Sequence, residues 1–400
     1  MNAPNELRSP VDHIRGYHAE LTGIRRDLHA HPELAFHESR TSSVVVAYLK
    51  KLGIETHAGL AKTGVVGVIK GRKSGSGRSV GLRADMDCLP MHETGTVPYR
   101  SKHDGRMHAC GHDGHTTMLL GAARYLAQTR NFDGTVHFIF QPAEEGGGGG
   151  KLMVDEGLFE RFPVDGVYGL HNTPRYPAGK FFTRPGPVMA SSASFDLLVS
   201  GRGGHAARPE SGLDPVVAAA HIITGLQTVV SRNVSPFESA VLSITQVHAG
   251  DAYNVIPEDV RICGNCRAYT TEVMDRIENS IRRIADNTAA AHGSRTRLDF
   301  RRGYPPLVNH AREAGIACDA AALVVGEANV DRDGEPRMAS EDFSFMLEAR
   351  PGAFIFLGNG DGEGSCDVHN PNYDFNDEIL PVGASYFVRL VEMTMPRGHR

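Results

Sequence analysis

The stretch SVGLRADMD, residues 79–87, is an apolar run that ends in acidic residues and is typical of a buried strand. TTMLLGAARYLAQTR, residues 116–130, has apolar residues at the spacing of one helix face. Two further strand-like runs follow, TVHFIFQPA (135–143) and VDGVYGLH (164–171). This alternation predicts an α/β fold with a sheet covered by helices on both faces. Such sheets bind ligands beyond the carboxyl ends of their strands.

Residues 191–303 follow a different pattern, in the order β-α-β-β-α-β. The expected elements are a strand near 195–199, a helix over about 214–232, strands over 239–248 and 258–269, a second helix and a strand near 298–300. This order is that of a ferredoxin-like α+β fold. The chain is therefore predicted to form a mixed-sheet α/β domain, residues 1–190 and 304–400, interrupted by a small α+β domain, residues 191–303.

Composition excludes several classes of protein. The chain has 400 residues, of which 40% are apolar and 22% charged, with a net charge of -5. This globular balance predicts no nucleic-acid partner and no membrane partner, because no basic surplus is present. The N-terminal MNAPNELRSPVDHIRGYH lacks the apolar core of a signal peptide, and six cysteines are too few for a disulfide framework. We expect a cytoplasmic protein with reduced thiols.

The segment HACGHDGH, residues 108–115, concentrates three imidazoles and one thiol in eight residues. Thiolate and imidazole ligands suit zinc and its transition-metal neighbours. A turn with a structural cysteine and solvated histidines is the alternative, and for any single histidine it would be preferred. The density favours a metal site in which Cys110 and His112 reach one point.

A second candidate is QPAEE, residues 141–145, at the end of a predicted strand. Neighbouring side chains in extended backbone diverge, so one of Glu144 and Glu145 can bind a metal while the other faces its water. That arrangement suits metal-assisted hydrolysis. The alternative is an acidic loop before five glycines. His171 and His369 could complete the ligand set, although each alone is more often structural.

Two other motifs were considered and given less weight. GRSVG, residues 77–81, matches the G-x-S-x-G pattern of serine hydrolases, which requires a strand before the serine and a helix after it. Ser79 is instead expected to follow a loop and to precede a strand. Cys263 and Cys266 form a C-x-x-C in a predicted strand, where their odd separation points the thiols to opposite faces. We expect both to be structural.

Taken together, these segments resemble the dinuclear metallohydrolase family that includes carboxypeptidase G, aminoacylases and hippurate hydrolases. The resemblance is strongest to its hippurate hydrolase and indole-acetyl-amino-acid hydrolase branch. The segments that carry it are RRDLHAHPELAFHE, LRADMDCLPMHE, HACGHDGHTTMLLGAA, FIFQPAEEGGGG, GLHN, GRGGHAARP, DAYNVIP, SEDF and HNPNYDFND. They extend from about residue 25 to residue 377.

The resemblance implies a role for each matched residue. The implied ligands of two divalent metal ions are Cys110, His112, Glu145, His171 and His369, with Glu144 as the general base. Asp85, Asp87 and Asp113 would hold the ligands in place. In the small domain, His205 would reach the scissile carbonyl, often from the partner subunit, while Asn254 and Arg267 would bind the carboxylate of the substrate.

The predicted function is hydrolysis of the amide bond of small N-acyl or N-aroyl amino acids by metal-activated water. Zinc or manganese is the expected metal, with cobalt and nickel as alternatives. The resemblance further implies a homodimer, formed through a small domain that acts as a lid. A dipeptidase or carboxypeptidase for short peptides is the main alternative. A non-catalytic metal-binding protein would not need Glu144, and a serine hydrolase would depend on Ser79.

Overall fold

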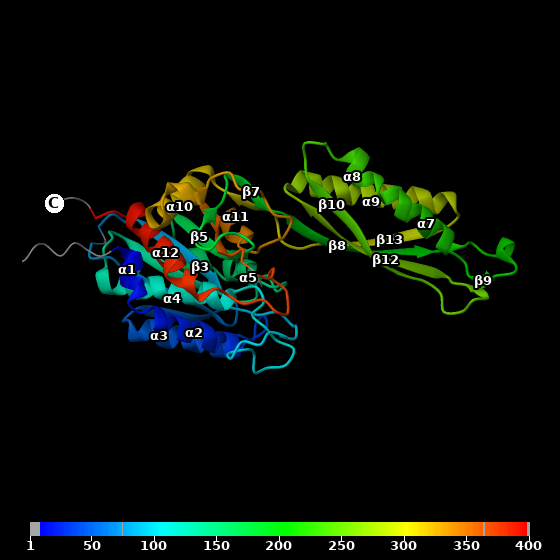
Figure 1. The fold of residues 1–400 in the computed structure, drawn as a ribbon. Helices are drawn as coiled ribbons and strands as arrows, with labels where there is room; N and C mark the ends of the chain where they lie inside the picture. Colours follow the sequence, from blue (N-terminus) through cyan, green and yellow to red (C-terminus); the bar gives the residue numbers. More distant parts are fainter. Residues whose placement is uncertain (1–8, 74, 363–364, 398–400) are drawn as a thin grey trace, which may run out of the picture. The chain divides into compact units, whose positions relative to one another are not determined.

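The computed structural model describes residues 9–73, 75–362 and 365–397, which divide into two compact units (Figure 1). The larger unit holds the described residues up to Gly186, Val308–Glu335 and those from Asp342 onward, and the smaller unit holds Pro187–Leu307 and Pro336–Glu341. Residues 1–8, part of the segment inspected for a signal peptide, lie outside the described chain. Within the described residues, no helix has the length and hydropathy needed to cross a membrane.

An eight-stranded mixed sheet forms the centre of the larger unit, in the order β1-β2-β4-β3-β5-β16-β6-β15. The strands are β1 (Glu55–Leu60), β2 (Gly64–Lys70), β3 (Ser79–Asp85), β4 (Thr135–Gln141), β5 (Gly166–Pro174), β6 (Phe181–Phe182), β15 (Val330–Asp331) and β16 (Gly352–Gly360). β3 pairs in parallel with both β4 and β5, and β5 pairs in parallel with β16, whereas β1–β2 and β2–β4 are antiparallel. The predicted α/β class with a mixed sheet is confirmed.

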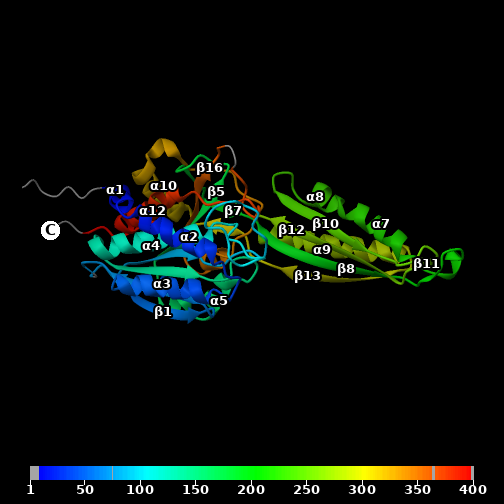
Figure 2. The ribbon, with the colours of Figure 1, turned by 60° about the horizontal axis from the view of Figure 1, so that its bottom comes forward.

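Helices cover this sheet because its strands are apolar on both sides. Val80, Leu82 and Ala84 of β3 belong to one large core together with residues of the helices α4 and α12. Gly81 and Arg83 point to the opposite face, which carries α5 and α11. The helices of this unit are α1 (Pro10–Arg15), α2 (His18–Ala30), α3 (Ser39–Lys51), α4 (His112–Thr129), α5 (Gly149–Asp155), α6 (Leu158–Arg161), α10 (Ala311–Val325), α11 (Ser344–Ala349) and α12 (Leu380–Thr394). Figure 2 shows α3 beside β1 at one end of the sheet.

The smaller unit contains a four-stranded antiparallel sheet in the order β10-β12-β8-β13. Its elements are β8 (Ser191–Ser200), α7 (Pro215–Leu226), α8 (Thr228–Asn233), β10 (Ala240–His248), β12 (Asp259–Ala268), α9 (Thr271–Ala291) and β13 (Arg295–Arg302). β9 (Gly204–His205) pairs with β11 (Val255–Ile256), and β7 (Gly186–Met189) pairs with β14 (Leu307–Asn309). The element order and strand order are those of a ferredoxin-like fold. Its action as a lid stays a prediction.

Residues 336–341 lie in the smaller unit, although the sequence analysis assigned them to the α/β domain. The amide of Ala190 is within hydrogen-bonding distance of the carbonyl oxygens of Arg337 (3.0 Å) and Ala339 (2.9 Å), which attaches this segment beside the start of β8. Such a return of the chain to a distant strand leaves no periodic pattern in the sequence.

The two cysteines of the C-x-x-C motif lie on opposite faces of β12, as their spacing predicts. Cys266 is fully buried in the core beneath the helices. Cys263 faces the other side, where its thiol donates a hydrogen bond to Asp196 Oδ1 at 2.9 Å. Both thiols are free, in agreement with a structural role.

A matched pair of leucine substitutions tests the position of the core. Leu82 in β3 is fully buried, whereas Leu323 in α10 is 58% exposed. Leu82→Ala should lower the free energy of unfolding by about 2–5 kcal/mol, because it removes buried methyl groups and leaves a cavity. Leu323→Ala should change it by less than about 0.5 kcal/mol. Urea unfolding followed by circular dichroism measures both, and equal effects would contradict this placement of the core.

Candidate metal and catalytic site

Three neighbouring parallel strands, β4, β3 and β5, present polar residues at the same edge of the sheet. Asp85 is the last residue of β3, Glu144 and Glu145 follow β4, and His171 lies in the second half of β5. Parallel strands place their carboxyl ends side by side, so residues distant in sequence meet there. Ser79 begins β3 at the opposite edge and is followed by a strand, which argues against a serine nucleophile.

Cys110 and His112 enter this site from the start of α4. Gly111 between them has a φ of 93°, in the left-handed region that favours glycine. A Cβ atom at this position would lie only 2.3 Å from Asn172 Oδ1. The glycine therefore permits both the sharp turn into the helix and the close approach of Asn172.

The structure brings the five predicted metal ligands together. The Sγ atom of Cys110 lies 3.4 Å from His171 Nε2, and His369 Nε2 lies 3.2 Å from Glu145 Oε1. Potential ligand atoms lie within 4.8 Å of one another in two groups that share Cys110: Cys110 with His112 and His171, and Cys110 with Glu145 and His369. One thiolate at the junction of two ligand groups is an arrangement suited to a pair of metal ions.

Two buried polar atoms support the fit to a metal. His112 Nδ1 lies 3.0 Å from the carbonyl oxygen of Asp87, so the proton is placed on this nitrogen. His112 Nε2 is buried and forms no hydrogen bond with any described residue, and the buried Glu145 Oε1 has the ring nitrogen of His369 as its polar neighbour at 3.2 Å. Buried polar atoms without hydrogen bonds are destabilising, and a cation would satisfy both. The residues present therefore fit a divalent metal.

The electrostatics of the site also favour a cation. Burial lowers the pKa of His171, and the neighbouring His115 lowers it further, so this imidazole is neutral and able to act as a ligand. Burial raises the pKa of the Cys110 thiol, and the nearby carboxylates of Glu145 and Glu144 raise it further. Cys110 is consequently a thiol until a cation stabilises the thiolate.

Asp87 and Asp85 contact residues of the ligand cluster. Asp87 Oδ2 accepts a hydrogen bond from the backbone amide of Glu145 at 2.9 Å, while its other carboxylate oxygen lies 3.2 Å from His112 Nδ1. Burial lowers the pKa of His112, but Asp85 and Asp87 outweigh this effect and raise the pKa to about 10, so a metal ion at Nε2 would have to displace a proton from it. These contacts place both aspartates beside the ligand cluster, and their role in orienting the ligands stays a prediction.

His115 is a site residue that was not among the predicted ones. Its Nδ1 lies 2.6 Å from Asp85 Oδ1 and its Nε2 lies 2.7 Å from Asn172 Oδ1. Asp85, His112 and His115 also form a group of potential ligands, yet both ring nitrogens of His115 already have partners. We therefore assign His115 to orienting Asp85. Its spacing of three residues from His112 on one helix was the signal that could have identified it.

Asp113 contacts two side chains of α2. Its Oδ2 lies 2.9 Å from His29 Nδ1 and 3.6 Å from Arg25 Nη1. Its role in holding the metal ligands stays a prediction. Arg25 is fully buried and also donates to Asp377 at 2.6 Å, in the segment HNPNYDFND that begins with His369. Asp113 and Arg25 thereby connect the start of α4 to the loop that carries His369.

His369 itself is held by its backbone. It has a φ of 62°, unusual for a residue with a side chain, and its amide donates to the carbonyl of Ala109 at 2.7 Å. This bond joins the His369 loop to the residue just before Cys110. The position of the fifth ligand is therefore coupled to that of the first.

In the smaller unit, His205 and Asn254 lie together, but Arg267 does not join them. His205 pairs with Val255 across the β9–β11 ribbon, and Ala206 donates to the carbonyl of Asn254 at 3.0 Å. Arg267 is eight residues beyond the start of β12, the end next to this ribbon, and strands rise by about 3.3 Å per residue, or about 26 Å in all. One copy of the chain therefore cannot place Asn254 and Arg267 on the same substrate carboxylate.

The family model for "Peptidase family M20/M25/M40" matches residues 81–393. The chain belongs to this family. The dinuclear metallohydrolase resemblance inferred from the motifs is thereby confirmed at the level of the M20 family.

Relatives of this M20 chain cover nearly its whole length. A hippurate hydrolase from Campylobacter jejuni subsp. jejuni is 43% identical over 95% of the chain and 98% of the relative. An N-acetylcysteine deacetylase from Bacillus subtilis is 38% identical, with the same two coverages. The Arabidopsis thaliana IAA-amino acid hydrolase ILR1-like 4 is 40% identical over 91% of the chain and 83% of the relative.

A solved structure agrees with these relatives. The Bacillus subtilis YXEP protein, described as a dinuclear metal binding peptidase from the M20 family, superposes with a TM-score of 0.83 at 35% identity. The superposition covers 95% of the chain and 99% of that protein. The five clustered ligand residues all lie inside the M20 match, whereas Arg25 and His29 precede it.

The pH dependence of stability tests the contact between His29 and Asp113 in this M20 protein. Burial lowers the pKa of His29, but hydrogen bonds to Asp113 and Glu93 outweigh it and raise the pKa from 6.5 to about 9. A raised pKa contributes stability that is complete below 6.5 and is lost as the pH rises through about 9. His29→Gln should therefore destabilise the protein most at about pH 6 and progressively less at about pH 8 and 10.

Urea unfolding at these pH values measures the difference from wild type. His92→Gln is the control, because the His92 side chain is 72% exposed. An effect of His29→Gln that stays constant across this range would contradict a protonated His29.

Proposed function

We propose that the protein is a metal-dependent amidohydrolase that cleaves the amide bond of N-acyl or N-aroyl amino acids, releasing a carboxylic acid and a free amino acid. The observation that carries this proposal is the ligand cluster sharing Cys110, with the buried carboxylate of Glu144 beside it. The names of the relatives, a hippurate hydrolase, a deacetylase of N-acetylcysteine and an amino acid conjugate hydrolase, support the substrate class.

Two divalent ions are the proposed cofactors. Their proposed ligands are Cys110, His112, Glu145, His171 and His369. Bound metal would lower the pKa of a water molecule and polarise the amide carbonyl of the substrate. The thiolate of Cys110 favours zinc, while manganese, cobalt and nickel are the alternatives. The name of the B. subtilis structure, a dinuclear metal binding peptidase, supports the pair.

Glu144 is the proposed general base. It is 6% exposed, and one of its oxygens lies within 4.8 Å of potential ligand atoms of His112 and Glu145. Its carboxylate takes a proton from water, whose oxygen then bonds to the amide carbon. The same carboxylate delivers that proton to the leaving nitrogen as the carbon–nitrogen bond breaks. The products are a carboxylic acid and an amine.

The smaller unit supplies the remaining groups in this proposal. His205 donates a hydrogen bond to the developing oxyanion, and Arg267 pairs with the substrate carboxylate through its planar guanidinium. Since Asn254 and His205 lie far from Arg267 within one copy, we propose that they come from the partner subunit of a homodimer. A cytoplasmic location also stays a prediction.

A substrate panel tests the reaction class. Hippurate and N-acetyl amino acids should be hydrolysed, a chelator should abolish the activity, and zinc, manganese, cobalt or nickel should restore it. An unblocked dipeptide carries an α-ammonium group where the proposed substrate has an acyl group, and should react much more slowly. Preference for the dipeptide would favour the dipeptidase alternative, and activity that survives chelation would contradict the metal mechanism.

Replacement of the general base separates chemistry from metal binding. Glu144→Gln should lower kcat about 10²–10⁴-fold, because the amide cannot accept the proton. Its metal content, measured by mass spectrometry, should match that of wild type. Glu160→Gln, at an exposed position in α6, is the matched control and should keep full activity. A Glu144→Gln enzyme with near-normal turnover would refute this role.

Mixing two inactive variants tests the contribution of the partner subunit. Glu144→Gln and His205→Ala should each be inactive alone. After subunit exchange, half of the dimers are mixed and each mixed dimer has one complete site, so about a quarter of the wild-type activity should return. Activity that fails to return, although mass spectrometry shows mixed dimers, would mean that His205 acts within its own chain.

A further inference from the structure

A cavity lies in the larger unit, at the edge of the sheet opposite the metal ligands. It has a volume of about 450 Å³ and is lined by the first residues of β3 and β5, the start of α10 and the end of α12. The six residue steps from Ser79 to Asp85 span about 20 Å of strand, so this cavity is separate from the catalytic cluster. Its size is in the range of small-molecule sites.

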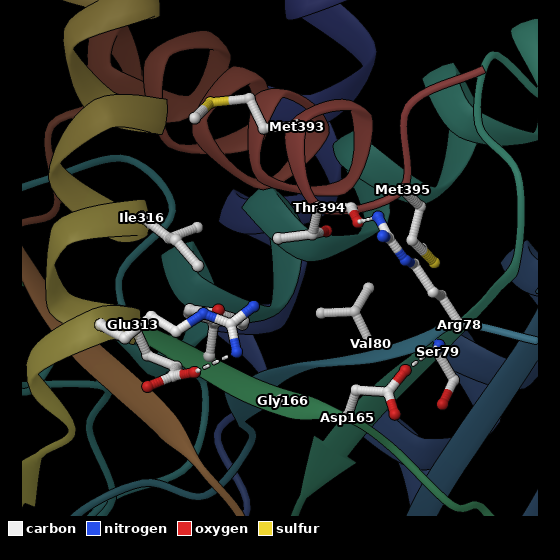
Figure 3. Close-up of a pocket in the computed structure, with 12 residues that line it drawn as sticks. Arg78, Ser79, Val80, Asp165, Gly166, Glu313, Ile316, Met393, Thr394 and Met395 are labelled. Carbon is white, nitrogen blue, oxygen red and sulfur yellow. Dashed lines mark hydrogen bonds and ion pairs between the residues drawn. The ribbon is translucent and has the colours of Figure 1, made fainter. Parts of the chain in front are cut away.

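Charges of both signs surround this cavity. Figure 3 shows Glu313 on one side of the opening, with Ile316 above it, and Arg78 and Asp165 on the other, with Val80 between the two sides. Arg78 donates to the carbonyl of Thr394 at 3.0 Å, and Asp165 accepts from the amide of Ser79 at 2.8 Å. These bonds hold the two side chains at the rim. An opening with charges of both signs favours neither a simple anion nor a simple cation, and it suits a ligand that carries both charges.

Arg312 and Glu313 supply neighbouring charges at the start of α10. Arg312 Nη1 lies 3.9 Å from Glu313 Oε1. The guanidinium of Arg312 forms no hydrogen bond with the described residues, so its donors are available. The Glu313 side chain is only 9% exposed, which fixes its carboxylate at the cavity wall.

Tyr168 adds a hydroxyl group to the cavity wall. It is 2% exposed and lines the cavity. The hydroxyl lies beside Gly166, where an added Cβ would be 3.5 Å from it. A hydroxyl at the wall can donate a hydrogen bond to a bound ligand or accept one from it.

The remaining wall is apolar. Val80, Ile316, Met393 and Met395 line the cavity between the charged positions. Methionine side chains adapt to apolar groups of different shape. The ligand should therefore combine an apolar body with a charged end.

We propose that this cavity binds a free α-amino acid with an apolar side chain. The ammonium and carboxylate of such a molecule are attached to one carbon, so they need neighbouring partners of opposite charge, which Arg312 and Glu313 provide. Tyr168 offers a further hydrogen bond, and the methionines contact the side chain. Binding here does not depend on the proposed hydrolysis, although a free amino acid is one product of that reaction.

Three ligands with one apolar body test the proposal by calorimetry on the metal-loaded enzyme: L-phenylalanine, 3-phenylpropanoate and 2-phenylethylamine. L-Phenylalanine should bind about tenfold or more tightly than either singly charged compound, because only it satisfies both charges. Arg312→Gln and Glu313→Gln should each weaken its binding about tenfold, and Tyr168→Phe about threefold. Arg15→Gln is the matched control, since Arg15 is exposed and lies 3.8 Å from Asp12 in its own helix.

The location of the amino acid binding site is tested separately with a photoreactive diazirine analogue of leucine. After irradiation, the label should map to peptides that carry Ile316 or Met393–Met395, and an excess of L-phenylalanine should suppress it. Labels confined to the catalytic cluster, or L-phenylalanine affinity unchanged in Arg312→Gln and Glu313→Gln, would overturn the proposal. Because none of these measurements requires turnover, a failure of the proposed hydrolysis would leave them interpretable. Circular dichroism verifies that the variants are folded.

Discussion

The parallel pairing of β3 with β4 and β5 is the constraint on which the site depends. Asp85 lies opposite Gln141, the last residue of β4, and Arg83 lies opposite Gly169 of β5. This register places the loop after β4 and the second half of β5 beside the end of β3. A shift of one residue would turn Asp85 to the other face of the sheet, because side chains alternate along a strand.

The charged groups buried in the larger unit need hydrogen-bonding partners of opposite charge within the fold. Arg83 is almost fully buried and donates to Asp85 Oδ2 at 2.8 Å, Gln141 Oε1 at 2.9 Å and Asp342 Oδ1 at 3.1 Å. Arg25 does the same on the other side of α4, with Asp377 and Asp374. Buried charges are tolerated when they are paired and hydrogen-bonded. These two arginines therefore neutralise the supports of the site, while the ligand cluster retains an excess of carboxylates that favours cations.

The same strands also connect two different environments. At their carboxyl ends β3 and β5 present imidazoles and carboxylates near the thiol of Cys110, a set of soft and hard ligands suited to transition metals. At their opposite ends they line a cavity with charges of both signs and an apolar wall. Each end takes its chemistry from the loops and helices that meet there, while the interior of the sheet stays apolar and rigid.

Much of the fold around residues 79–171, and part of the ligand cluster, could be predicted from the local sequence pattern. Apolar runs and helical spacing predicted the strands and helices around 79–171. The Cys110-Gly111-His112 turn is formed by neighbouring residues, so the high density of soft metal ligands there could be recognised in the sequence. The odd spacing of Cys263 and Cys266 predicted their opposite faces. His171 and His369, distant from Cys110 in the chain, were only possible members of the ligand set until the resemblance to a family assigned them.

Only the tertiary structure decided how these residues are used. His112 and His115 are both histidines at the start of one helix, yet Asp85 and Asn172 occupy both nitrogens of His115 and leave Nε2 of His112 without a hydrogen bond. Asn254 and Arg267 are close in sequence but are separated by most of the length of β12. The sequence by itself determined residue chemistry and local periodicity. Partners and distances depend on strand register and on contacts between segments far apart in the chain, which local pattern does not encode.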